Sequence, residues 1–237
     1  MLYRVDLYVC GNVDGLQSEI SVKIHGAMMK QITGEYAEKL HISEYHPYSI
    51  YVFPYGSGYV IRVSALNEEA KEIIDAMAEL KKITLYGVKE PLIVTDIKPY
   101  APIDVNSFSS IGGKSARVEF ITPAMIKTGG RPSCKPDIPT YFYSVILKYN
   151  QFENANIDFN EFVEAYNAVQ IEAYCLESTR YNVTGHIFPG MLGYVDFSFP
   201  RNKAQSQLLK TVFSYAEYCG VGGKTGMGMG GINFLCE

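Results

Sequence analysis

The feature that most constrains the fold of this chain is a repeated switch between strand-like and helix-like apolar patterns in its first hundred residues. Apolar and polar residues alternate over residues 3–9, the period of two expected of a strand with one buried face. Apolar side chains then recur at helical spacing over 26–40, and we expect one helix there, weakened but not broken by Gly34. Two β-rich runs, 50–53 and 59–63, are separated by Pro and Gly residues, which predicts a hairpin.

A second helix and a closing strand complete this pattern. Asn67 is a helix-capping residue type, and Glu68 and Glu69 after it suit the positive first turn of a helix. Apolar residues continue at helical spacing to Leu80, and residues 92–97 form a strand pattern. The order is βαββαβ, which predicts a ferredoxin-like unit.

The second half repeats this order with insertions. Residues 99–113 are rich in Pro, Ser and Gly and lack periodicity, so we expect two domains, 1–105 and 106–237, with the boundary near residue 105. The elements expected after it are a strand (117–121), a Gly- and Pro-rich loop (122–139), helices (140–151 and 158–168), strands (169–176, 181–187 and 191–199), a helix ending at Gly220, and a closing strand (232–236). The predicted fold class is α+β, with two tandem ferredoxin-like (RRM-like) units.

Composition excludes several classes of protein. With 47% hydrophobic and 19% charged residues, the chain is not of the disordered class. Its apolar runs fall far short of the roughly 20 residues that span a bilayer, and its N-terminus lacks the features of a secretion signal. We therefore expect a cytoplasmic protein with no membrane partner. Five scattered cysteines without a C-x-x-C pair, and histidines without H-x3-H spacing, lead us to expect no disulfide, metal or cofactor.

Charge is distributed unevenly along the chain. The net charge of −4 argues against nonspecific attraction to nucleic acid. Residues 111–135 are the exception, because their only acidic residue is Glu119 and they carry several basic side chains: Lys114, Arg117, Lys127, Arg131 and Lys135. Any site for a polyanion is therefore expected to be local.

The glycine-rich segment 220–231 is the strongest local signal. Its Gly-Gly-Lys-Thr sequence is not a P-loop, because Tyr218 stands where the motif needs glycine and a strand follows where it needs a helix. Glycine lets a backbone approach a ligand and present N–H groups to anions, and Lys224 adds a charge. The alternative is a tight helix-to-strand connection, which needs only one or two glycines. We therefore expect this segment to contact a phosphate backbone.

The spacing Gly220-Val-Gly222, five residues, then Gly228-Met-Gly230 resembles the G-h-G-x5-G-h-G signature of CRISPR-associated endoribonucleases that process repeat RNA into guide RNA. Leu40-His41 resembles the catalytic histidine of that family. Further segments continue the resemblance, namely Phe120-Ile-Thr-Pro123, Pro139 to Asn150 and Gly190 to Tyr194. The resemblance implies a metal-independent RNase that cuts CRISPR repeat RNA, stays with its product, and acts as a monomer or homodimer, with other CRISPR-complex proteins as further partners.

Four residues are the catalytic candidates. RNA supplies its own nucleophile, the 2′-OH, so cleavage to a 2′,3′-cyclic phosphate and a 5′-OH needs a base, an acid and positive charge. The resemblance implies that His41 is catalytic, although a histidine at a helix end can also simply cap carbonyls. His46 and Tyr48 follow it, and Lys30 is the candidate for charge stabilisation. His25, at an expected helix start, is expected to be structural.

Candidate RNA-binding residues lie in two loops. The basic loop supplies Lys127 and Arg131, with Lys114 before it, although a run of charges is usually a solvated surface. The glycine-rich segment supplies Gly220, Gly222, Lys224, Thr225, Gly228 and Gly230. A non-catalytic RNA-binding subunit is the alternative function. Whichever function holds, each half is expected to leave one sheet face exposed, through which two copies of the chain could pair.

Overall fold

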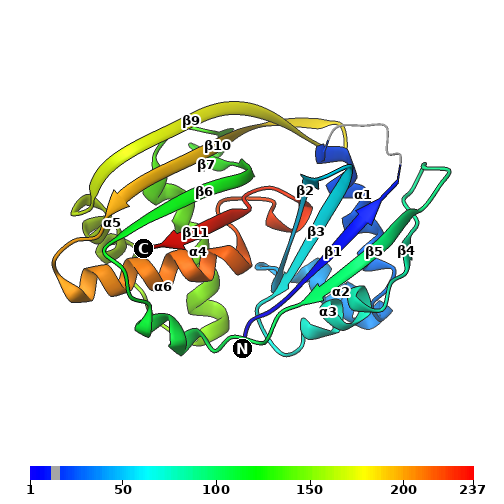
Figure 1. Ribbon diagram of the computed structural model, residues 1–237, viewed down its shortest axis with the longest axis horizontal. Helices are drawn as coiled ribbons and strands as arrows, with labels where there is room; N and C mark the ends of the chain where they lie inside the picture. The colour runs from blue at the N-terminus through cyan, green and yellow to red at the C-terminus, as the bar shows by residue number, and fades with distance from the viewer. Residues whose placement is uncertain (12–16) are drawn as a thin grey trace.

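The first half folds around a five-stranded antiparallel sheet of order β2-β3-β1-β5-β4 (Figure 1). The computed structural model describes residues 1–11 and 17–237. Alternate residues of β1, including Val5 and Leu7, pack against Ile24 of α1 and Ile73 of α3 in one core. The elements are β1 (Tyr3–Cys10), α1 (Gln17–Met29), α2 (Gly34–Ile42), β2 (Tyr48–Tyr55), β3 (Gly58–Ala65), α3 (Lys71–Ala78), β4 (Lys82–Ile83) and β5 (Leu92–Pro99).

The single helix expected over 26–40 is wrong, because the chain forms α1 and α2 with a break between them. Thr33 ends the break: its side chain accepts a hydrogen bond from the Tyr36 amide at 3.4 Å and caps α2. Gly34 is the first residue of α2 rather than an interior one. The apolar stripe continues across the break because Met28, Ile32 and Tyr36 all face the same core.

The second half contains a four-stranded antiparallel sheet of order β11-β6-β10-β9, covered by α4 and α6. The elements are the 3-10 turn η1 (Val105–Ser110), β6 (Ser115–Ala124), β7 (Ile126–Thr128), β8 (Arg131–Ser133), α4 (Ile138–Glu153), α5 (Phe159–Asn167), β9 (Gln170–Val183), β10 (His186–Ser198), α6 (Lys203–Cys219), the 3-10 turn η2 (Thr225–Met227) and β11 (Ile232–Cys236). None of the described helices is both long and apolar enough to cross a membrane.

Two expectations about this half are corrected. The three strands expected over 169–199 are two long strands, β9 and β10. Gly190 lies inside β10, where a Cβ would come within 2.5 Å of the Pro123 side chain. The glycine allows the two strands to approach and does not end one. The loop expected over 122–139 contains the β7–β8 hairpin.

The two halves meet along β2 and the end of α6. Ser49 Oγ donates to the Tyr218 carbonyl at 2.5 Å. Arg4 Nη2 donates to the Glu217 carbonyl at 2.6 Å, and its guanidinium lies 4.0 Å from the centroid of the Tyr218 ring. Arg4 and Asp6, expected on an open face of β1, are therefore only 9% and 2% exposed. The expectation of one exposed sheet face per half is wrong around β1 and β2, and that region cannot serve for dimer pairing.

Candidate active site

Three elements of the first half converge on the ring of Tyr48. Tyr48 opens β2, His25 projects from α1, and His46 lies in the loop between α2 and β2. A hydrogen bond of 2.9 Å joins His25 Nε2 and the Tyr48 hydroxyl. The His46 ring stacks on the Tyr48 ring, with the ring centroids 5.6 Å apart. His46 and Tyr48, both predicted from the sequence, therefore belong to one cluster, together with His25.

The environment of this cluster favours neutral side chains. Burial lowers the pKa of His25 to about 4, and the charges of His46 and His41 add to the effect. Burial also lowers the pKa of His46, assisted by the charges of Lys148 and His41 and opposed by a hydrogen bond with the Leu40 backbone. Burial raises the pKa of Tyr48 to about 12. At neutral pH the cluster holds unprotonated imidazoles that can accept a proton.

His41 lies at the edge of this cluster. It occupies the last turn of α2 and is exposed to solvent. Its charge is among the causes that lower the pKa of His25 and of His46, both of which are less exposed than His41. His41 is therefore the imidazole of this group that a large ligand reaches first.

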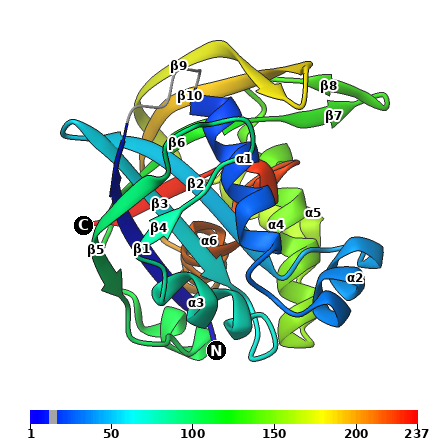
Figure 2. The ribbon, with the colours of Figure 1, turned by 90° about the vertical axis from the view of Figure 1, so that its right-hand side faces the viewer.

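The glycine-rich segment of the second half packs directly on this cluster. A Cβ built on Gly226, in η2, would lie 3.1 Å from Cε2 of Tyr48. Lys148 of α4 is buried beneath the segment, where its ammonium donates to Thr225 Oγ1 at 2.8 Å and to the Cys219 carbonyl at 2.9 Å. Figure 2 shows the segment, in red, between α1 and α4. The structure therefore brings the histidines and the glycine-rich segment together.

The signature glycines are required by the packing of the segment itself. Gly222 and Gly230 have φ values of +69° and +75°, and an added Cβ would lie 2.2 Å from the Met125 carbonyl oxygen and 2.0 Å from the Val221 carbonyl oxygen, respectively. Gly228 has φ +95°, and its Cβ would lie 2.5 Å from the Ser21 Cβ. Such positions accept only glycine without strain.

Several amides of the segment are already engaged within the chain. Gly220 N donates to the Ala216 carbonyl at 2.8 Å, Gly222 N to Tyr141 at 3.0 Å and Gly230 N to Pro123 at 2.9 Å. The expectation that these three amides face a phosphate is therefore wrong. They anchor the segment to α6, α4 and β6, as the alternative of a tight helix-to-strand connection requires.

The exposed cations near this segment come from two places. Lys224, with φ +63°, places its ammonium 4.8 Å from the centroid of the Phe188 ring. Lys127 and Arg131 are exposed on the β7–β8 hairpin. That hairpin begins directly after Met125, whose carbonyl accepts from the Gly223 amide at 2.8 Å. The hairpin therefore starts beside the glycine-rich segment.

Two further predicted residues lie outside the elements that carry the cluster. Lys30 is exposed in the turn that follows α1. Lys114 directly precedes β6, so it lies at the start of this strand, whereas Ala124 is its last residue. The Lys114 amide donates to the Glu237 carbonyl at 2.7 Å. Arg117 is also separate, because it forms an ion pair with Asp196 at 2.6 Å. The basic residues of 111–135 therefore do not form one patch.

Sequence reasoning missed Lys148 and assigned His25 only a structural place. Lys148 follows Tyr141 and Val145 at helical spacing, so it occupies a core-facing position of α4. A lysine at such a position was a readable signal, because lysine is almost never fully buried without a partner. His25 lacked a comparable signal, since only the fold places it beside Tyr48.

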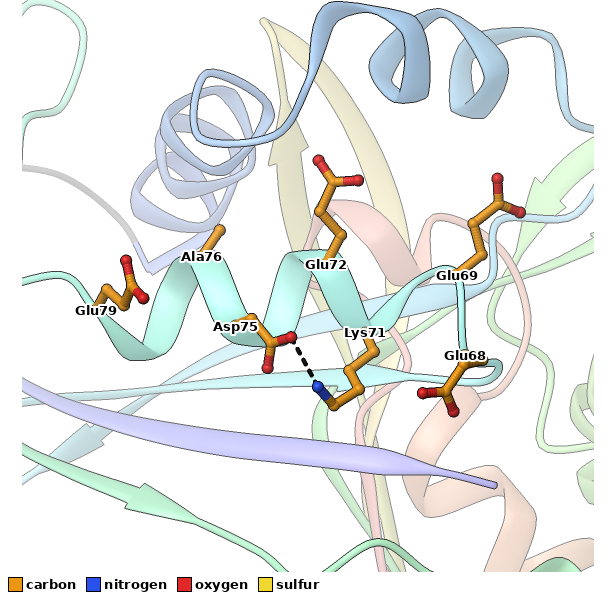
Figure 3. A pocket seen from close by; sticks show the side chains of 7 residues that line it. All are labelled: Glu68, Glu69, Lys71, Glu72, Asp75, Ala76 and Glu79. Carbon is orange, nitrogen blue, oxygen red and sulfur yellow. Dashed lines mark hydrogen bonds and ion pairs between the residues drawn. The ribbon is translucent and has the colours of Figure 1, made fainter.

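A different surface of the first half is strongly acidic. Carboxylates line a shallow hollow along α3, where the single lysine is paired with Asp75 at 2.8 Å (Figure 3). The side chains that line it are Glu68, Glu69, Lys71, Glu72, Asp75, Ala76 and Glu79. Such a surface repels a polyanion. A nucleic acid is therefore expected to approach from the side of the histidines and the β7–β8 hairpin.

Comparison with known proteins agrees with this geometry. Residues 118–232 match the sequence model of a family described as CRISPR-associated endoribonuclease Cas6. The chain is 23% identical over 229 residues to a CRISPR-associated endoribonuclease Cas6 of Streptococcus thermophilus, with 93% of each chain covered. A protein of the same name from Mycobacterium tuberculosis is 24% identical over 219 residues, which cover 88% of this chain and 69% of that protein.

The fold is similar to that of solved Cas6 structures. A Cas6 product complex superposes with a TM-score of 0.80 at 17% identity, covering 100% of this chain and 99% of the other. Thermus thermophilus Cas6 gives a TM-score of 0.74 at 18% identity, covering 99% and 98%. These likenesses confirm the predicted fold of two ferredoxin-like units.

Proposed function

We propose that this chain is a CRISPR-associated endoribonuclease, like the family whose sequence model matches residues 118–232, and that it cleaves CRISPR repeat RNA without a metal ion. One observation carries the proposal: the histidine cluster of the first half lies against the glycine-rich segment of the second. Gly226 packs on Tyr48, whose hydroxyl forms a hydrogen bond with His25. An RNA strand held along the junction would pass within reach of His41 and His46.

The proposed reaction is attack by the 2′-OH on the adjacent phosphorus. The bond from phosphorus to the 5′-oxygen breaks, which leaves a 2′,3′-cyclic phosphate and a 5′-OH. His41, which is exposed, is the first candidate for proton transfer, and the neutral His46 is the second. Tyr48 orients the imidazoles, and Lys30 is a candidate to stabilise charge from the rim.

The proposed grip on RNA uses the cations around the segment. Lys224, Lys127 and Arg131 are exposed on neighbouring elements and would contact phosphates. Thr225 is fixed by Lys148 and shapes the floor of the site. The buried glycines hold the segment in place, so their contribution to RNA binding is indirect.

We propose that the two domains comprise residues 1–105 and 106–237. The strands support this division, because the first sheet ends with β5 at Pro99 and the second begins with β6 at Ser115. The catalytic histidines then belong to the first domain and the glycine-rich segment to the second.

A cleavage assay tests this function. End-labelled RNAs from a panel of CRISPR repeats are incubated with the chain in EDTA, and we expect one repeat to be cut at one position. A single 2′-deoxy substitution at that position should abolish cutting, because it removes the nucleophile. His41→Ala should lower the single-turnover rate by about 10²- to 10⁴-fold, the usual contribution of a general acid or base. Tight binding without cutting would instead indicate a non-catalytic RNA-binding subunit.

A further inference from the structure

Lys148 is a buried cation without a buried anion beside it. Its side chain lies in the core of the second half, with 7% of the residue exposed. The acceptors of its ammonium are the Cys219 carbonyl and the Thr225 hydroxyl, both neutral. No carboxylate of the described residues forms an ion pair with it. A buried charge of this kind is costly to a fold, so its position calls for a reason beyond stability.

The two acceptors of Lys148 mark the two ends of one turn. Cys219 is the last residue of α6, and Thr225 is the first residue of η2. Between them the chain makes the turn that contains Gly220 and Gly222. The ammonium therefore fixes both ends of this turn to α4, and η2 in turn packs on Tyr48.

We propose that Lys148 is a positioning residue for RNA cleavage, whose ammonium ties Thr225 and the end of α6 to α4 and so holds the glycine-rich segment against the histidine cluster. This inference rests on the proposed endoribonuclease function. It assigns to the second half a part in the chemistry besides RNA binding.

The charge of Lys148 also reaches the histidines. The charges that act on His46 are those of Lys148 from α4 and His41 from α2, the Tyr48 ring of β2 stacks on it, and its own charge lowers the pKa of His25 on α1. Lys148 is among the causes that lower the pKa of His46, after burial. Loss of the ammonium should therefore raise that pKa, and the limb of the pH–rate profile that reports His46 should move to higher pH.

Lys148→Met removes the ammonium, and Lys210→Met is the matched control. Lys210 is a second buried lysine, 6% exposed, on α6. Its ammonium donates to the Ile111 and Gly113 carbonyls at 3.1 and 2.8 Å, away from the histidines. The two variants therefore lose similar groups at different places.

Single-turnover cleavage of the repeat RNA selected by the unmodified chain is measured against pH. We expect Lys148→Met to be at least about tenfold slower at saturating RNA than Lys210→Met, with its profile moved to higher pH, as for loss of a group that aligns reacting parts. Equal rates and superimposed profiles for the two variants would overturn the inference. If Lys148→Met does not fold, Thr225→Val decides: a rate lowered several-fold supports the inference, and an unchanged rate overturns it.

NMR titration of the His46 ring in the RNA-free chain separates this inference from the proposed function. A higher pKa in Lys148→Met but not in Lys210→Met supports the link between Lys148 and the cluster, and the same pKa in both contradicts it. Failure of the unmodified chain to cut any repeat would overturn the proposed function, whatever the titration shows.

Discussion

At the scale of single residues, the site depends on one tyrosine that serves several partners. The Tyr48 hydroxyl is hydrogen-bonded to His25, and its ring stacks on His46 and is covered by Gly226. Its raised pKa keeps the hydroxyl protonated, so it links the imidazoles without adding a charge. Tyr48 therefore fixes the positions of His25 and His46, while burial is the main cause of their lowered pKa values.

The buried histidines make the stability of the chain dependent on pH. The pKa of His25 is about 4 when folded, against an ordinary value of 6.5, so between these values the unfolded chain binds the proton more readily. Its contribution to stability is complete above pH 6.5 and is lost as pH falls toward 4.

Urea unfolding at several pH values measures this effect. We expect the free energy of unfolding to fall between pH 6.5 and 4, and to fall less in His25→Asn. His186→Asn, at an exposed position of β10, is the control and should keep the full dependence. An identical dependence in all three chains would show that His25 is not responsible.

At the scale of elements, the glycine-rich segment is a packed connection. Gly222→Ala should lower the free energy of unfolding by more than about 2 kcal/mol, because it adds a backbone clash to an unfavourable φ. Gly129→Ala is the control: it has φ +57° and open space around it, so the cost should stay near 1 kcal/mol. Equal losses in denaturant unfolding would mean that Met125 yields to the new methyl group.

The sequence predicts elements better than it predicts what glycines do. The β2–β3 hairpin, α3 and α6 follow from apolar spacing, because this signal is local. Asn67 is not the N-cap of α3, because the helix begins at Lys71 and Asn67 accepts from the Ala70 amide in the turn before it. The break before Thr33 was missed because the apolar stripe runs across it. The packing role of Gly222 was missed because its closest neighbour, Met125, comes from a distant part of the chain. No local pattern reports such a contact.

At the scale of the whole molecule, charge is separated between two surfaces. The hollow along α3 is lined by carboxylates (Figure 3), whereas Lys127 and Arg131 are exposed on the β7–β8 hairpin, whose strands are labelled in Figure 2. The net charge of −4 conceals this separation. The contacts that join the two halves lay beyond the sequence, since those of Arg4 and Ser49 with the end of α6 connect distant parts of the chain.

Salt dependence of RNA binding tests this arrangement. Arg131→Glu should weaken binding and lower the slope of log K against log salt by about 1, as expected for loss of one phosphate contact. Lys82→Glu, an exposed change on β4, has the same effect on net charge and should leave the slope unchanged. Equal slopes for both variants in filter-binding titrations would remove the hairpin from the RNA surface.

The contact between Gly226 and Tyr48 joins two parts that are far apart in the sequence. The imidazoles of His25, His41 and His46 come from the first half. The glycine-rich segment is anchored to α4, α6 and β6 of the second half. Substitutions before residue 50 can therefore alter or abolish scission while the anchoring of the segment persists. Few substitutions would therefore be enough to convert a nuclease of this kind into a protein that binds its RNA without cutting it.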